Sequence, residues 1–207
     1  MKRHHPQAET LLDVACGTGK HLEYLAETYE IAGVDIDKAL LAKARTRLPN
    51  ANFFEQDMLE LSVPHTFDVV TCLFSAIGYV QAPANLDRAV ANFAAHVKAP
   101  GLVIVEPWLT PDVWQVGQTG LTVYDNPDQP DIKITRMNTA ERDGDLSIMT
   151  MHYLVGTPAG IDHHVETHTL GLFSLARYID AFAKAGLDLQ HDPEGLMGRG
   201  LFVGVKH

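Results

Sequence analysis

The sequence has little positive charge, few cysteines and no long apolar run. Its 16 lysine and arginine residues stand against 26 aspartate and glutamate residues, so the formal net charge is −10 with histidine taken as neutral. A surface this acidic repels phosphate backbones and anionic lipids, and the sequence contains no cluster of lysine or arginine to offset the repulsion. Nucleic acids and membrane surfaces are therefore not expected as partners.

Two cysteines, Cys16 and Cys72, are too few for a disulfide framework, which is typical of proteins in a reducing cytoplasm. Both lie in apolar stretches, so we expect them to be buried and unreactive. No apolar run approaches the roughly 18 residues of a membrane-spanning helix. The first ten residues include basic side chains but no apolar core, so they do not resemble a signal peptide. These features favour a cytoplasmic protein.

Strand-like and helical patterns alternate along the first half of the 207 residues, a length that fits one domain. Strands are predicted at residues 11–15, 31–36, 52–57, 67–74 and 102–107. Helices are predicted at residues 18–28, from the N-cap Asp37 to residue 48, and at 83–98, with a turn at Pro100 and Gly101. The alternation predicts an α/β fold with a parallel sheet that helices cover on both faces.

The helical pattern disappears between residue 108 and about residue 170. Strands are predicted there at 131–140, 146–155 and 161–170, and Asp143-Gly144 is typical of a hairpin turn. The α/β pattern then resumes with a helix at 174–186, which Gly186 ends, and strands at 187–192 and 201–206. We therefore expect one domain over residues 1–207, with an antiparallel meander inserted at about 108–170.

A short glycine loop follows the first predicted strand, in the stretch Asp13-Val14-Ala15-Cys16-Gly17-Thr18-Gly19. Glycine lets a ligand approach the backbone, and N–H groups at the start of the next helix point toward that ligand. In a doubly wound sheet the ligand lies beyond the carboxyl ends of the strands. The nicotinamide pattern G-x-G-x-x-G needs a third glycine that this loop lacks, so a ligand without phosphates fits the loop better.

Acidic residues lie at or near the ends of the first three predicted strands. Asp13 can hold a cationic amine, directly or through water, and Asp35 can accept hydrogen bonds from both hydroxyls of a ribose. Asp57 can accept from the amino group of adenine, and apolar neighbours can flank the ring. Asp35 or Asp57 alone could equally cap a helix or lie in a loop, but the ordered series of these acids with Asp13 and the two loop glycines describes a site for S-adenosylmethionine. The predicted cofactor-binding residues are Asp13, Ala15, Gly17, Gly19, Asp35, Ile36, Asp57, Met58 and Phe74.

Five stretches extend this pattern over nearly the whole chain: LLDVACGTGKHLEYL, AGVDIDKALLAKARTRLPNANFFEQDM, FDVVTCLFSAIGYV, GLVIVEPW and GRGLFVGV. They resemble class I methyltransferases, and more narrowly the N,N-dimethyltransferases of nucleotide-linked 3-amino sugars, of the desosamine and mycaminose type. The resemblance implies a Rossmann-like fold with a mostly parallel seven-stranded sheet and an antiparallel insertion that shapes the substrate pocket. It also implies S-adenosylmethionine as cofactor and the amine of a sugar as methyl acceptor.

The chain departs from that group at two places. Members of the group have a few dozen residues before the first strand, which form helices over cofactor and substrate, whereas ten residues precede Leu11 here. We therefore expect the aromatic and basic residues of that lid to be missing. A histidine that can follow the Glu-Pro-Trp stretch in the group has no match, and Thr110 stands near its place.

Methyl transfer to an amine requires a neutral nucleophile held in line with the methyl group, so a nearby base would help. Glu106, at the end of the fifth strand, and His168 are the candidates for this catalytic role, although Glu106 could equally be a structural carboxylate. Arg199, between two glycines, could contact a phosphate or sugar oxygen or could be a surface arginine. Trp108 could line the sugar pocket or pack in the core.

His164, Glu166 and His168 share one face of a predicted strand and suggest a metal site as a rival interpretation. The outer two residues lie about 13 Å apart along an extended strand, which is too far for a compact triad. We therefore expect no metal.

The acceptor remains open between an amino sugar and another small molecule with a hydroxyl or amino-acid group. A catalytically inactive cofactor-binding protein is the third hypothesis. The sequence has neither the Asn/Asp-Pro-Pro-Tyr/Phe signature of base methylation nor a Pro-Cys nucleophile, so a nucleic-acid substrate is not expected. The expected partner is a small-molecule acceptor, and the oligomeric state stays open, with a homodimer as one option.

Overall fold

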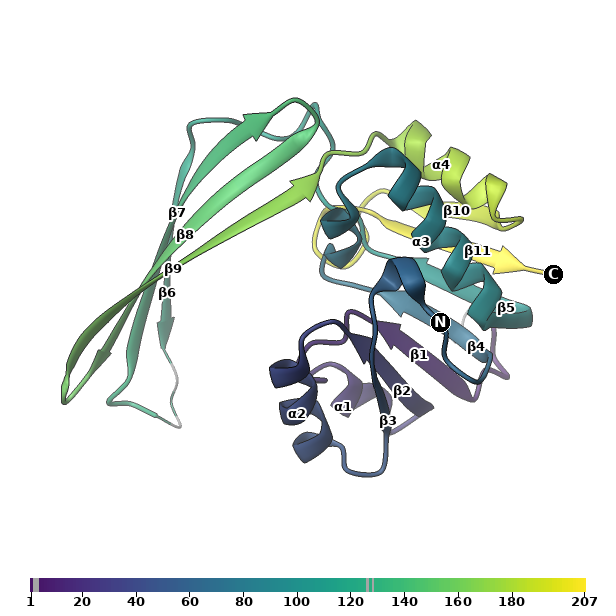
Figure 1. The fold of residues 1–207 in the computed structure, drawn as a ribbon, viewed down its shortest axis with the longest axis horizontal. Helices are drawn as coiled ribbons and strands as arrows, with labels where there is room; N and C mark the ends of the chain where they lie inside the picture. Colours follow the sequence, from purple (N-terminus) through teal and green to yellow (C-terminus); the bar gives the residue numbers. More distant parts are fainter. Residues whose placement is uncertain (2–3, 126, 128) are drawn as a thin grey trace. The chain divides into compact units, whose positions relative to one another are not determined.

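The computed structural model describes residues 1, 4–125, 127 and 129–207, and its ribbon is drawn in Figure 1. These residues form two compact units. The first unit comprises Met1–Trp108 and Phe173–His207, and the second comprises Leu109–Leu172. No helix within the described ranges is long and apolar enough to cross a membrane.

A seven-stranded sheet is the centre of the first unit. Its strands are β1 (Thr10–Val14), β2 (Glu30–Asp35), β3 (Asn52–Glu55), β4 (Phe67–Cys72), β5 (Val97–Val105), β10 (Asp188–Asp192) and β11 (Leu201–Lys206). They lie in the order β10-β11-β5-β4-β1-β2-β3. Strands β1 to β5 pair in parallel, and β11 is antiparallel to both β5 and β10. The predicted α/β fold is confirmed, and the strand order reverses between β1 and β4, where open sheets of this kind bind ligands.

Helices cover this sheet. They are α1 (Leu22–Leu25), α2 (Lys38–Arg47), α3 (Pro83–His96) and α4 (Leu175–Lys184), with 3₁₀ turns η1 (Met58–Glu60) and η2 (Ala76–Val80). Asp37 caps α2 by accepting hydrogen bonds from the N–H groups of Ala39 at 2.7 Å and Leu40 at 3.0 Å. The predicted cap is thus confirmed, and Gly186, at φ +72°, follows α4 as predicted.

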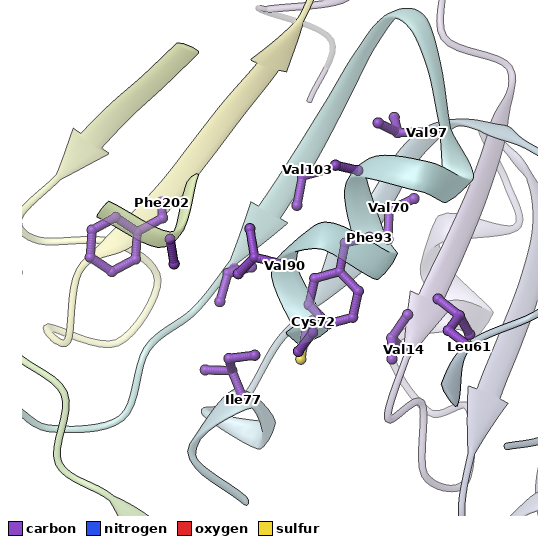
Figure 2. Packing of buried hydrophobic residues seen from close by; sticks show 14 of the residues in the cluster. Val14, Leu61, Val70, Cys72, Ile77, Val90, Phe93, Val97, Val103 and Phe202 are labelled. Carbon is purple, nitrogen blue, oxygen red and sulfur yellow. The ribbon is translucent and has the colours of Figure 1, made fainter. Parts of the chain in front are cut away.

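Alternate residues of the central strands enter two separate apolar cores, which is why these strands are apolar throughout. Leu12 and Val14 of β1 belong to one core, and Leu11 belongs to the other. Figure 2 shows Val90 and Phe93 of α3 in the first core, together with residues of the sheet. The second core receives apolar side chains from α1 and α2.

Two local predictions were wrong. A helix was expected over residues 18–28, but α1 has four residues, and Gly17 and Gly19 take positive φ values in the turn before it. A turn was expected at Pro100 and Gly101, but β5 runs through both residues. The pairing of β4 with β5 shifts register between Phe67 and Val69, which accommodates the extra length of β5.

The second unit is a four-stranded antiparallel sheet, which confirms the predicted meander. Its strands are β6 (Thr119–Asp125), β7 (Lys133–Asp143), β8 (Leu146–Thr157) and β9 (Gly160–Gly171), in that order. Gly144, at φ +55°, lies in the predicted hairpin between Asp143 and Leu146. The strand β6, which pairs with β7, was not predicted from the sequence.

Candidate functional site

The glycine loop between β1 and α1 has the geometry of a ligand cradle. Ala15, Gly17 and Gly19 have φ values of 62°, 56° and 67°. A Cβ atom built on Gly17 would meet nothing within 4 Å, so the space beside this residue is open. A Cβ on Gly19 would lie 3.3 Å from the Cβ of Ala44 in α2. Gly17 thus leaves room for a ligand, and Gly19 lets the loop pack against the next helix.

Asp35, at the end of β2, ties this loop to the neighbouring strand. Its side chain is buried, and its Oδ2 accepts a hydrogen bond from the N–H of Gly17 at 2.7 Å. Its Oδ1 accepts from the N–H of Asp37 at 2.9 Å. Each carboxylate oxygen has a second lone pair and can accept one further hydrogen bond. The geometry is therefore compatible with the predicted ribose contact, which stays a prediction.

Exposed apolar side chains stand at the ends of β2 and β4. Ile36 is 69% exposed and Phe74 is 58% exposed, so both side chains present apolar surface beyond the strand ends. Asp57, after β3, caps the turn η1 by accepting from the N–H of Leu59 at 2.8 Å, and Met58 is half-buried. Asp57 therefore has the capping role that was one of its two interpretations, and its second oxygen can still accept.

Asp13 lies deeper than the other two acids, with 1% of its surface exposed. Its Oδ1 accepts a hydrogen bond from Thr71 Oγ1 at 2.6 Å, and its Oδ2 lies 2.8 Å from Nε2 of His21. Neither partner was predicted from the sequence, because Asp13 and Thr71 become register partners only when β1 pairs with β4 in the folded sheet.

His21 also packs its ring against Phe74, with the ring centroids 5.3 Å apart. Burial of the imidazole lowers the pKa of His21, but the carboxylate of Asp13, 2.8 Å from Nε2, outweighs burial through its contact and its charge. The net result is a pKa above the ordinary value of 6.5. His21 thus links the buried carboxylate of Asp13 to the exposed ring of Phe74.

A second group of residues joins the ends of β4 and β5. Glu106 is completely buried, and its Oε2 accepts a hydrogen bond from the N–H of Phe74 at 2.7 Å. Its Oε1 is buried and has no hydrogen-bond partner among the described residues. Ser75 is buried as well and donates from Oγ to the carbonyl oxygen of Pro107 at 2.7 Å.

Arg199 and Trp108 meet beside this group. The guanidinium carbon of Arg199 lies 5.4 Å from the centroid of the Trp108 ring, within the range of a cation–π contact. Nη1 of Arg199 donates to Ser75 Oγ at 2.6 Å. Both residues are half-buried. Arg199 is therefore not a plain surface arginine, and Trp108 is not a plain core residue. The two predicted acceptor-binding residues therefore form one cluster.

His168 belongs to the second unit. It lies on β9, where its Nε2 is 3.5 Å from Oε2 of Glu166, and it is a register partner of Met149. Within the described part of the chain, no group of three or more His, Cys, Asp or Glu side chains could hold a metal ion. The two cysteines are free and buried as predicted, and burial raises the pKa of both thiols.

The strand order and the glycine loop are those of class I methyltransferases, and residues 11–101 match the family model of a methyltransferase domain. The dTDP-3-amino-3,6-dideoxy-α-D-glucopyranose N,N-dimethyltransferase of Streptomyces fradiae is 41% identical over 99% of this chain and 80% of the relative. The dTDP-3-amino-3,4,6-trideoxy-α-D-glucopyranose N,N-dimethyltransferase of Streptomyces venezuelae is 37% identical, over 97% of this chain and 84% of the relative. The chain belongs to the methyltransferase family that contains these dTDP-amino-sugar N,N-dimethyltransferases.

Two solved structures extend this finding to the whole fold. The crystal structure of Streptomyces venezuelae DesVI has a TM-score of 0.94 at 36% identity, over all of this chain and 87% of that one. The S-adenosylmethionine-bound structure of CalS10, an amino pentose methyltransferase from Micromonospora echinaspora, has a TM-score of 0.91 at 35% identity, over all of this chain and 86% of that one. The predicted recognition and fold class are both confirmed.

The His21–Asp13 pair predicts a pH-dependent contribution to stability. Because folding raises the pKa of His21, this contribution is complete below the unfolded pKa of about 6.5 and is lost as the pH rises through the folded pKa. The difference in unfolding free energy between the wild type and His21→Gln should therefore shrink as the pH rises. Urea unfolding at several pH values measures this difference.

The exposed pair of His207 and Asp188 supplies the control. Its Nε2–Oδ2 distance is also 2.8 Å, but both side chains are more than 70% exposed, so His207→Gln should have little effect on stability. A difference for His21→Gln that stays constant over the whole pH range would contradict the assignment.

Proposed function

We propose that the protein transfers methyl groups from S-adenosylmethionine to the amine nitrogen of a nucleotide-linked amino sugar. The observation that carries the proposal is the contact of Arg199 with Trp108 beside the end of β5. It offers a cation and an aromatic ring to a sugar with an anionic diphosphate, in a protein of net charge −10. The relatives that are 41% and 37% identical act on dTDP-linked amino sugars, which supports the same acceptor class.

The residues at the ends of β1, β2 and β4 fit the cofactor. Open space beside Gly17 and the free lone pairs of Asp35 suit a ribose and an amino-acid end that carry no phosphate. Ile36 and Phe74 present apolar surface that an adenine ring would cover. Asp13 is already bonded to Thr71 and paired with His21, so we expect it to meet the amine of the cofactor through water. When bound, S-adenosylmethionine supplies a methyl group on a sulfonium that is already activated for transfer.

Asp35→Ala should weaken the binding of S-adenosylmethionine by about 1.5–3 kcal/mol, because charge-assisted hydrogen bonds to the ribose are lost. Isothermal titration calorimetry on the folded variant measures the effect. Asp37→Ala is the control, because it removes the cap of α2 without removing a proposed cofactor contact. Unchanged affinity in a folded Asp35→Ala variant would remove the glycine loop and Asp35 from the proposed cofactor site. Binding of a nicotinamide dinucleotide would remove the cofactor assignment itself.

An amine attacks only in its neutral form and releases a proton as its new N–C bond forms. We propose Glu106 and His168 as the two groups available to receive this proton. Glu106 has one buried oxygen with no hydrogen-bond partner among the described residues, and its other oxygen holds the backbone of Phe74. Burial of the acceptor amine in an apolar pocket would also favour its neutral form.

We propose that the chain is one domain and that its insertion, residues 108–170, determines which acceptor is used. Loops at the carboxyl ends of strands confer specificity on a shared scaffold. His168→Ala should raise the KM for the acceptor or lower kcat, and leave the affinity for the cofactor unchanged. His164→Ala is the matched control on the same strand face. If His168→Ala weakens cofactor binding as much as it impairs use of the acceptor, the proposal that the insertion determines only the acceptor is contradicted.

In the same assay, Glu106→Gln should lower kcat by about 10²-fold or more if Glu106 receives the proton.

Arg199→Ala tests the acceptor class directly. It should reduce kcat/KM for a dTDP-linked 3-amino sugar by about 1.5–3 kcal/mol, the range for a hydrogen bond to a charged group. The free amino sugar should be affected much less, because it carries no phosphate. Equal losses for both acceptors would place Arg199 at the sugar or in the fold. If the wild type methylates neither acceptor, the amino-sugar proposal fails while the cofactor proposal stands.

The second unit also supports a proposal about assembly. One face of its sheet carries the exposed apolar side chains of Leu121, Val123, Met137, Leu154 and Val165, which share that face by strand register. A twofold axis would let two copies of this face cover each other, so we propose a homodimer. Light scattering should give twice the chain mass of 22.8 kDa, and a monomer at assay concentration would contradict the dimer.

The two free, buried cysteines support a reducing compartment, and we propose the cytoplasm as the site of action. Fractionation of the producing cells tests this location, since recovery of the protein outside the cytoplasmic fraction would contradict it.

A further inference from the structure

The turn after β4 has an uncommon backbone. Phe74 and Ser75 are consecutive residues with φ values of 53° and 64°, and neither is glycine. A side chain in this left-handed region costs about 1–3 kcal/mol, and such residues persist where surrounding contacts hold them. The turn lies at the carboxyl end of β4, beside the switch point of the sheet. The contacts of Phe74 and Ser75 hold this conformation in place.

Two hydrogen bonds join this turn to the end of β5. Glu106 accepts from the N–H of Phe74, and Ser75 donates its hydroxyl proton to the carbonyl oxygen of Pro107 at 2.7 Å. Because that proton is committed to Pro107, the lone pairs of the Ser75 oxygen have fixed directions. The Ser75 side chain is 1% exposed, so no bulk water competes for them.

Arg199 uses one of these lone pairs. Its Nη1 donates to Ser75 Oγ at 2.6 Å, and the same guanidinium lies over the Trp108 ring. An arginine side chain has many rotamers, and holding one of them before a ligand arrives reduces the entropy lost on binding. The left-handed backbone of Ser75 places its hydroxyl between the carbonyl of Pro107 and the guanidinium.

We propose that Ser75 is a positioning residue that holds Arg199 over Trp108 for the nucleotide-linked acceptor. The inference rests on the proposed function, because it assumes that Arg199 meets the acceptor. If the Ser75 hydroxyl only maintains the turn, its loss should change the stability of the fold. If it positions Arg199, its loss should change the KM for the acceptor and the Kd for dTDP. Four single variants and one double variant separate these two roles.

Ser75→Ala removes the hydroxyl, and Ser75→Gly removes it while relieving the left-handed backbone. Both should raise the KM for the dTDP-linked amino sugar and the Kd for dTDP by about three- to tenfold, the effect of one lost hydrogen bond. The Kd for S-adenosylmethionine should not change. Ser147→Ala is the control for losing a buried hydroxyl, since Ser147 is fully buried and donates to the carbonyl of Leu170 at 3.0 Å.

The double variant shows whether Ser75 acts through Arg199. In the Arg199→Ala background, Ser75→Ala should change KM and the Kd for dTDP by less than about twofold, because the positioned group is already gone. Effects that multiply in the double variant would overturn the proposal, as would wild-type values in a folded Ser75→Gly variant. If Arg199→Ala itself leaves the acceptor KM and the dTDP affinity unchanged, the proposed role of Arg199 fails and the inference about Ser75 fails with it.

Discussion

The hydrogen bond from the N–H of Gly17 to the carboxylate of Asp35 is the constraint on which the candidate site depends. It joins the loop after β1 to the end of β2, and the same carboxylate receives the N–H of Asp37 at the start of α2. One buried side chain thereby sets the loop, the strand end and the helix entry relative to one another. The open space beside Gly17 follows from this arrangement, because the loop is held in a left-handed conformation without packing over it.

The candidate site has an acidic half, formed by Asp13, Asp35 and Asp57, and a half that contains the cation of Arg199. Asp35 and Asp57 each accept backbone N–H groups, and Asp13 is paired with His21 and bonded to Thr71. These donors stabilise carboxylates that the net charge of −10 would otherwise disfavour. At the other half, the guanidinium of Arg199 lies against an aromatic ring and a hydroxyl. The first half therefore suits a cationic ligand without phosphate, and the second suits an anionic one.

The ends of β4 and β5 behave as one structural piece. Glu106 holds the backbone of Phe74, and Ser75 holds the carbonyl of Pro107, so the two strand ends are joined twice. The turn leaves the Phe74 side chain exposed and directs Ser75 toward Arg199. These two hydrogen bonds hold the turn and offset the cost of its two left-handed residues.

The sequence by itself determined the α/β order, the cap at Asp37, the meander and the hairpin at Gly144, because each depends on local periodicity or on one residue's conformational preference. It also located the glycine loop and the acids at the strand ends, since parallel strands bring their carboxyl ends to one edge. The length of α1, the strand β6 and the path of β5 through Pro100 depended on tertiary packing and pairing that local patterns do not contain. The partners of Asp13, the turn at Ser75 and the contact of Arg199 with Trp108 join residues up to 124 positions apart, and only the folded chain brings such residues together.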